Sequence, residues 1–310
     1  MQVQVEGVRP LWFDDGSPVR AASALAPLGG GWLVAQDDAT HGALVRGGSV
    51  ERLRLVPPVE GHEVFSEADG TKHLKPDLEA ACGLVLDRGA PGVLLLGSGS
   101  TERRRRAVLV AEGPASGAGG PQVASGPLDA LYNAVARALA VPEGQLNLEG
   151  VARNGSVLRW FQRGNLAAGV PSGSVDVDLP GLVEALLGRL DPAEVRIKDP
   201  RTYELGTVRG VGLAATDAVA LPGGRVLLSA AAEDTPNAYD DGPVVGAALT
   251  LLDGDAVVDL VGLPEVGGVV QKVEGLGVVE LLDDGARLLA VVDADDPLAA
   301  SSELVLRLTW

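Results

Sequence analysis

Residues 147–165 read Asn-Leu-Glu-Gly-Val-Ala-Arg-Asn-Gly-Ser-Val-Leu-Arg-Trp-Phe-Gln-Arg-Gly-Asn. Two apolar runs flank the dipeptide Asn154-Gly155, which favours a tight turn between antiparallel strands. The stretch therefore predicts a β-hairpin that starts near Glu149 and closes on a polar cluster. An isolated hairpin is marginal in water, so this one must pack on similar units.

The same phrase occurs five times, at residues 22–38, 77–100, 147–165, 216–234 and 272–296. A small or acidic residue near the start of each copy serves as its anchor: Ser23, Glu79, Glu149, Asp217 and Glu274. The anchors are 56 to 70 residues apart, which is room for four strands and their loops. The repeat predicts an all-β fold, a single β-propeller domain over residues 1–310 with five four-stranded blades, six blades being the alternative.

The two chain ends complete the predicted ring. Residues 303–310 supply only one further strand for the last blade, so residues 3–12 are expected to pair with them and close the propeller. Two other segments, 127–140 and 180–190, show helical periodicity after an initial proline. We expect them to form short helical insertions between blades.

The composition limits the classes of partner. The formal charge of −17 repels phosphate backbones and anionic lipid headgroups, so neither nucleic acid nor a membrane is expected as a partner. The single cysteine, Cys82, excludes an internal disulfide. No leader peptide or long apolar window is visible. We expect a cytoplasmic monomer that binds a small-molecule substrate or ligand.

The anchors predict a metal site. The first strand of each blade lines the axis, so Glu79, Glu149, Asp217 and Glu274 are expected to project toward one centre, with Ser23 as the neutral fifth member. Neighbouring carboxylates repel unless they are protonated or bind a cation, and oxygen ligands favour Ca²⁺ or Mg²⁺. The alternative is that these acids cap strand ends around a water-filled channel.

The closing clusters should stand around the same centre, because the end of the second strand of a hairpin lies beside the start of the first. The expected catalytic base is one of Asp293, Asp295 and Glu233. The expected substrate-binding residues are Arg163, Asn165, Lys272, Ser98, Ser100, Asp37 and Asp38.

The basic run at residues 103–106 is interpreted as a charged strand edge exposed to solvent, because alternate residues of a strand point to opposite faces. At most two of these arginines could serve one anionic pocket. His41 or His73 could act as a general base if it reached the axis, and a surface histidine is the alternative.

Three phrases resemble the Glu-Gly motifs of bacterial phytase-like (esterase-like) β-propellers: Asn147-Leu148-Glu149-Gly150-Val151-Ala152, Lys272-Val273-Glu274-Gly275-Leu276 and, more loosely, Pro76-Asp77-Leu78-Glu79-Ala80. Residues 229–235 and 240–246 look like a largely uncharacterised bacterial propeller group allied to them. The resemblance implies the propeller fold. Through related metal-dependent propellers such as gluconolactonases, it implies a central divalent ion held first by Glu149 and Glu274.

Together these features predict a divalent-metal-dependent propeller enzyme, a hydrolase of the phytase-like, esterase-like or lactonase-like kind acting on a small oxygen-rich or phosphorylated substrate. The alternative is a non-catalytic propeller scaffold that binds a ligand or a protein at the same face.

Overall fold

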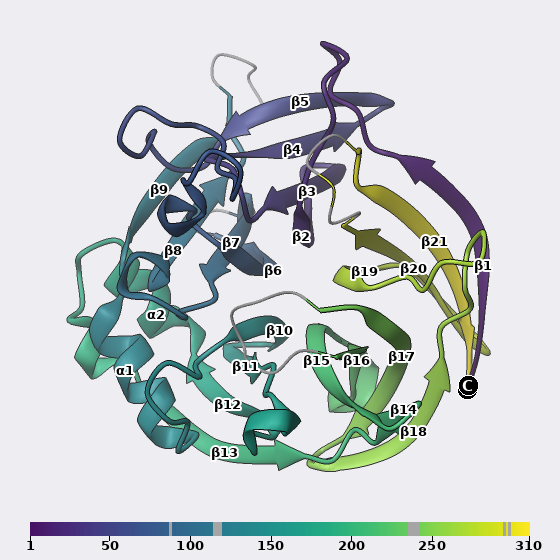
Figure 1. The fold of residues 1–310 in the computed structure, drawn as a ribbon. Coiled ribbons are helices and arrows are strands. Elements are labelled where there is room, and N and C mark those ends of the chain that lie inside the picture. Colours follow the sequence, from purple (N-terminus) through teal and green to yellow (C-terminus); the bar gives the residue numbers. More distant parts are fainter. Residues whose placement is uncertain (87–88, 114–119, 235–241, 294–295, 297–298) are drawn as a thin grey trace.

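The chain forms five β-sheets arranged radially around one axis (Figure 1). The computed structural model describes residues 1–86, 89–113, 120–234, 242–293, 296 and 299–310. The five-bladed propeller predicted from the repeat is confirmed, because each repeated phrase forms the two inner strands of one blade.

The first three blades have four antiparallel strands each. Blade 1 contains β2 (Ala22–Leu28), β3 (Gly31–Gln36), β4 (His41–Arg46) and β5 (Ser49–Arg54). Blade 2 contains β6 (Leu78–Val85), β7 (Pro91–Gly97), β8 (Arg106–Ala111) and β9 (Gln122–Pro127). Blade 3 contains β10 (Leu148–Asn154), β11 (Val157–Gln162), β12 (Ser172–Asp178) and β13 (Ile197–Tyr203).

Blade 4 differs from the four-stranded prediction. Its main strands are β15 (Val211–Ala220), β16 (Val226–Glu233), β17 (Val244–Asp253) and β18 (Ala256–Gly262). A fifth, two-residue strand, β14 (Thr207–Val208), pairs with the start of β15. It forms because β15 is long enough for the incoming chain to fold back on its first residues.

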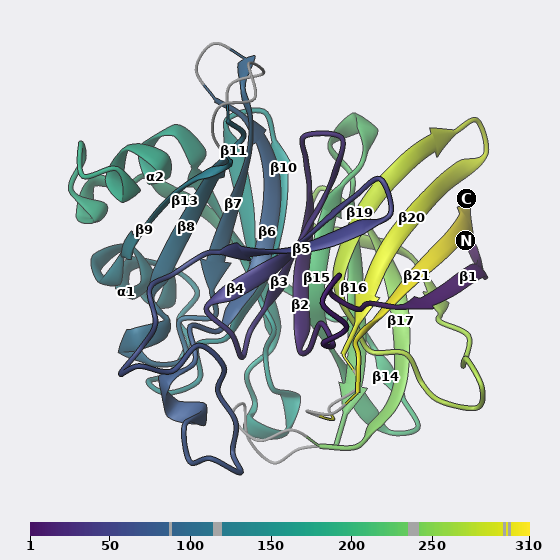
Figure 2. The same cartoon turned by 90° about the horizontal axis from the view of Figure 1, so that it is seen from above.

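Blade 5 closes the ring with both ends of the chain. Its strands are β19 (Val273–Leu282), β20 (Gly285–Val292), β21 (Ser302–Thr309) and, as the outermost strand, β1 (Gln2–Pro10). β1 runs antiparallel to β21 with Gln2 opposite Thr309, and Figure 2 shows the two termini side by side. This pairing gives β21 a hydrogen-bonded neighbour on both sides, as predicted.

Two helices fill the outer wedge between blades 2 and 3 (Figure 1). They are α1 (Asp129–Ala138), which lies within the segment 127–140 expected to be helical, and α2 (Leu179–Leu186), which begins one residue before the segment 180–190. The Tyr132 hydroxyl donates to the carbonyls of Gly97 and Arg106 at 2.8 and 2.9 Å. The Tyr132 ring meets Trp160 of β11 edge-on, with centroids 4.9 Å apart.

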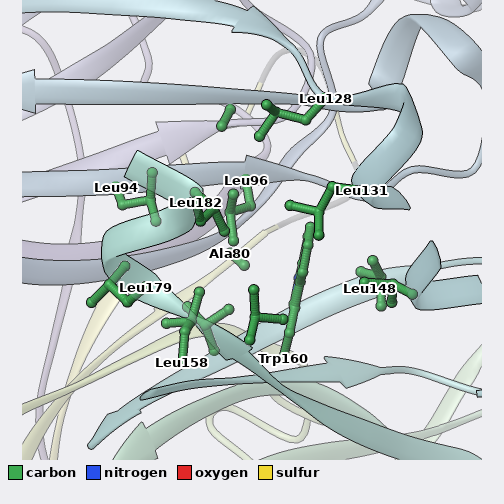
Figure 3. Close-up of a cluster of buried hydrophobic side chains, with 14 of the residues drawn as sticks. Ala80, Leu94, Leu96, Leu128, Leu131, Leu148, Leu158, Trp160, Leu179 and Leu182 are labelled. Atoms are coloured by element: carbon green, nitrogen blue, oxygen red, sulfur yellow. The ribbon is translucent and has the colours of Figure 1, made fainter. Parts of the chain in front are cut away.

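Leucines from both blades and both helices complete this apolar cluster (Figure 3). Burial of such side chains supplies most of the stabilisation between neighbouring blades, at about 25 cal/mol per Å² of apolar area. No helix in the described part of the chain is long and apolar enough to cross a membrane.

Candidate functional site

A β-bulge interrupts the inner strand of every blade. The register between the first and second strand of each blade skips one residue of the inner strand, and the skipped residues are Ser23, Glu79, Glu149, Thr216 and Glu274. A bulge frees a residue from the ladder and re-aims its side chain. The five bulges therefore present one side chain per blade at the same end of the axis.

The fourth anchor predicted from sequence was displaced by one residue. Thr216 occupies the bulge of blade 4. The next residue, Asp217, is again paired with the second strand, opposite Ser229. Thr216 is the counterpart of Ser23, because both hydroxyls donate to a carbonyl of the next blade: Ser23 to Leu78 at 2.5 Å and Thr216 to Val273 at 2.6 Å. Both accepting residues immediately precede a bulged glutamate.

The Glu-Gly pairs have a steric basis. A Cβ added to Gly150 would lie 2.8 Å from the backbone of Asp217, and one added to Gly275 would lie 2.9 Å from the backbone nitrogen of Leu25. The glycines after Glu149 and Glu274 thus let the neighbouring inner strand approach closely, whereas Glu79 is followed by Ala80.

Glu79, Glu149 and Glu274 line one polar pocket of about 370 Å³, called here the axial pocket. Its wall also includes further predicted residues, namely Ser23, Asp37, Asp38, Ser100, Arg163, Lys272 and Asp293. Lining residues that were not predicted are Arg20, Lys75, Asp77, Arg104 and Asn147. The volume suits a small ligand, because it lies at the lower end of the range for small-molecule sites.

One ion-pair network in the axial pocket joins blades 1 and 2. Lys75 contacts Asp37 and lies 2.7 Å from Asp77. Asp77 in turn lies 3.0 Å from Arg104, which donates to Ser100 at 2.8 Å. Ser98 donates to Asp77 from just outside the pocket wall. The two cations hold the pKa of Asp77 below its ordinary value against the effect of its burial.

A second network joins blades 3, 4 and 5. Arg163 lies 2.9 Å from Glu149 and also contacts Glu233. Lys272 lies 3.2 Å from Glu233 and 2.8 Å from Glu274. The backbone N–H of Gly242 donates to the other oxygen of Glu233 at 2.8 Å, so both oxygens of that carboxylate have partners and its pKa is lowered despite burial.

In this second network, Glu149 has one oxygen with two partners and one buried oxygen with none among the described residues. Its Oε1 accepts hydrogen bonds from Asn147 at 2.7 Å and Arg163 at 2.9 Å, whereas its buried Oε2 has no partner among the described residues. Burial, followed by the charge of Glu274, outweighs Arg163 and raises the pKa of Glu149 to about 7. Burial also raises the pKa of Glu274, against the opposing effects of Lys272 and Arg163.

Two other acids of the axial pocket also have raised pKa values. Burial and the charges of Asp77 and Asp37 hold the pKa of Glu79 well above its ordinary value. Burial and Asp37 raise the pKa of Asp38 to about 6, although Arg20 contacts it. The pocket therefore combines proton-bearing carboxyls with fixed ion pairs.

Three of the predicted site residues lie outside the wall of the axial pocket, besides Ser98. Asp217 is buried beside the neighbouring strand, where its Oδ2 accepts from the backbone N–H of Leu276 at 2.6 Å and burial raises its pKa. Asn165 caps a short 3₁₀ turn by accepting from Ala168 at 3.2 Å. Glu233 forms ion pairs with Arg163 and Lys272, which themselves line the pocket. Asp295 lies outside the described residues.

Lys75, Asp77 and Arg104 are the main residues that the sequence interpretation missed. The strand edge predicted at residues 103–106 was wrong, because Glu102–Arg104 form a 3₁₀ turn that buries Arg104 against Asp77. Only Arg104 of that run reaches the axial pocket. The sequence did carry a signal for Asp77, because it lies two residues before the anchor Glu79.

The histidines do not serve the axial pocket. His41 is buried in a separate cavity of about 520 Å³ beside Arg52 and Glu63, and burial lowers its pKa to about 4. His73 is exposed and does not line the axial pocket.

Within the described part of the chain, one group of three acids could hold a divalent cation, and Glu79 is the predicted ligand it contains. Asp37, Asp77 and Glu79 each offer an oxygen within 4.8 Å of the others. The ammonium of Lys75 already contacts two of these three acids, so an ion there would have to displace it. Glu149 and Glu274 each have a cationic partner as well. Calcium therefore stays a prediction, with Asp37, Asp77 and Glu79 as the residues that would hold it.

The comparisons with known proteins agree with this architecture. Residues 71–297 match a family described as "Family of unknown function (DUF6910)", which covers well over half of the chain. The chain belongs to the DUF6910 family. The match starts just before blade 2 and ends after β20, so this DUF6910 chain carries all three bulged glutamates within the matched part. No curated protein matches it.

Solved structures resemble this DUF6910 protein in fold. A GH43 β-1,3-galactosidase is 10% identical, with a TM-score of 0.50, over 97% of this chain and 60% of its own. An exo-β-1,3-galactanase from Phanerochaete chrysosporium is 10% identical, with a TM-score of 0.47, over 98% of this chain and 64% of its own. An arabinanase from Bacillus subtilis, also 10% identical, gives 0.45 over 99% and 98%. The chain thus spans under two thirds of the first two, and the likeness concerns the fold alone.

Proposed function

We propose that the axial pocket is the active site of a hydrolase that cleaves a C–O bond of a small hydroxyl-rich substrate by carboxyl acid–base catalysis. The observation that carries this proposal is the state of Glu149, whose buried Oε2 lacks a partner while Asn147 and Arg163 fix its Oε1. A carboxyl group with a pKa of about 7 can donate a proton at neutral pH.

Glu149 and Glu274 take the roles of acid and base in this proposal. Protonated Glu149 donates its proton to the leaving oxygen, and ionised Glu274, held by Lys272 at 2.8 Å, accepts a proton from the attacking water. Arg163 and Lys272 both contact Glu233, which keeps the two cations in place as charge moves between the acids. Asp293 also lines the pocket and is the alternative base.

The polar lining supports a hydroxyl-rich substrate. Asn147 and Ser100 offer neutral groups, and the pocket presents carboxyls beside Arg20 and Lys75. Such alternation of donors and acceptors matches the hydroxyl groups of a sugar or polyol. A phosphorylated substrate, which the phytase-like resemblance implies, would have to compete with acidic side chains for these cations.

The test uses para-nitrophenyl glycosides, para-nitrophenyl acetate and para-nitrophenyl phosphate as probes. The proposal expects turnover of a glycoside or the acetate, with kcat lowered about 10²-fold or more by Glu149→Gln or Glu274→Gln. The matched control Glu184→Gln, on an exposed face of α2, should leave kcat unchanged.

Two results would point elsewhere. Activity that EDTA abolishes and calcium restores would support the metal-dependent reading instead. No turnover of any probe, combined with tight binding of a sugar, would support the scaffold alternative. The pH profile adds a further check, because loss of the proton from Glu149 should give a falling limb near pH 7 that Glu149→Gln lacks.

A further inference from the structure

The end of the axis opposite the axial pocket opens into a second cavity, of about 1,020 Å³, called here the rear cavity. Its wall is built from the later residues of the five inner strands, including Leu25, Leu84, Val151, Val219 and Leu276. These side chains are apolar, whereas the axial pocket is lined by acids and bases. The two ends of the same axis therefore offer different chemistry.

The charged residues of the rear cavity are mostly basic, in a protein with a net charge of −17. The described lining contains four arginines and one glutamate: Arg9, Arg46, Arg153, Arg287 and Glu303. Three of these arginines have acidic partners. Arg9 lies 2.9 Å from Glu303, Arg287 lies 2.8 Å from Glu6, and Arg46 contacts Glu112.

Arg153 is bonded differently. Its Nε donates to the carbonyl of Gly155 and its Nη1 to the carbonyl of Gly83, both at 3.1 Å. Neither bond neutralises the guanidinium, and within the described ranges no carboxylate forms an ion pair with it. Two of its five N–H donors are used, so a fork of donors remains for an oxyanion. Gly83 lies next to Leu84, so this cation sits beside the apolar wall.

We infer that the rear cavity binds an aliphatic carboxylic acid, with its hydrocarbon chain on the apolar wall and its carboxylate on Arg153. The volume is large enough for a hydrocarbon chain together with its head group. The guanidinium of Arg153, which is bonded to carbonyls and not to a carboxylate within the described ranges, favours an anion over a neutral or cationic amphiphile. This assignment is independent of the hydrolase proposed at the other end of the axis.

Trp32 supplies a local reporter. It lines the rear cavity, and its ring lies so close to β19 that a Cβ added to Gly277 would be 2.5 Å from Cζ3 of the indole. A hydrocarbon chain entering the cavity should change the emission of Trp32. Trp32→Phe should remove that change while calorimetry still detects binding.

The experiment titrates decanoate, octanoate and 1-decanol into the full chain below their aggregation limits, by calorimetry and fluorescence. Decanoate should bind with one-to-one stoichiometry, and each methylene removed should weaken binding about fourfold. Arg153→Gln should weaken decanoate binding about tenfold or more and leave 1-decanol binding unchanged, because only the head-group contact is lost. Arg153→Lys should retain most of the affinity.

Arg196→Gln is the matched control, because it removes the same charge from an exposed site outside the rear cavity. It should leave decanoate binding unaltered. The inference is overturned if decanoate shows no saturable binding, if Arg153→Gln and Arg196→Gln bind it equally well, or if Arg153→Gln loses 1-decanol together with decanoate.

Discussion

The change Glu149→Gln should alter stability in a strongly pH-dependent way. Burial raises the pKa of Glu149 from 4.5 to about 7, so the folded protein binds this proton more tightly than the unfolded chain does. The resulting stabilisation is fully present below about pH 4.5 and is lost as the pH rises through 7. Glutamine does not titrate and resembles the protonated acid in shape.

The magnitude follows from the shift. Each pKa unit is worth about 1.4 kcal/mol, so wild type should lose about 3 kcal/mol relative to Glu149→Gln between pH 4.5 and pH 8. At pH 5 the two proteins should have nearly equal free energies of unfolding. At pH 8 the variant should be the more stable, because wild type must then keep an ionised carboxylate buried beside Glu274.

Urea denaturation at a series of pH values measures this difference directly. Glu184→Gln is the control, since an exposed glutamate should show no such trend. A difference between wild type and Glu149→Gln that stays constant from pH 5 to pH 8 would refute the reasoning. A variant that becomes progressively less stable toward pH 8 would do so as well, because it would mean that the ionised pair with Arg163 stabilises the fold.

Three further outcomes are expected. Arg163→Met should destabilise the protein by about 3 to 5 kcal/mol in urea melts, since it leaves the buried acids Glu149 and Glu233 without a shared cation. The control Arg189→Met, at the surface, should lower the free energy of unfolding by under about 1 kcal/mol. Equal effects of the two changes would contradict the ion-pair network. Thr216→Val should lower the free energy of unfolding by about 1 to 3 kcal/mol, because the carbonyl of Val273 loses its hydrogen-bond donor. The control is Thr202→Val on the outer strand of blade 3, and an equal loss of stability in both variants would argue against the inter-blade hydrogen bond. Deleting residues 2–10 should abolish cooperative thermal unfolding, because β21 then exposes an unpaired edge, and an unchanged melting temperature would show that the ring does not need this closure.

The fold could be predicted from sequence because its unit is local. Each hairpin turn, such as Asn154-Gly155, specifies two adjacent strands, and five copies leave few architectures that bury their apolar faces. The closing pair β1 and β21 followed from counting strands in the last repeat. Neither step required knowledge of long-range contacts.

The candidate site was only partly predictable. The bulged residues Ser23, Glu79, Glu149 and Glu274 were identified from their place in the repeat, but in the fourth copy Asp217 was chosen instead of the bulged residue, its neighbour Thr216. A bulge shifts the register by one residue, and the sequence alone does not show on which residue it falls.

The ion-pair partners were harder to predict. Lys75 precedes its blade in a turn, and Arg104 is placed by a 3₁₀ turn inside an arginine run, so the spacing of the repeat carries no information about either residue. Their positions depend on loops packed across blade boundaries. The rear cavity was likewise invisible, because its apolar wall uses the same residues that any inner strand would need.

The most direct test of the proposed catalytic acid is ¹³C NMR titration of protein labelled at the glutamate δ-carboxyl carbons, with the Glu149 signal assigned by its absence from Glu149→Gln. The account predicts that this carboxyl titrates near pH 7. A midpoint at or below its ordinary value of 4.5 would show that Glu149 is ionised at neutral pH, and the proposed proton donor would be lost.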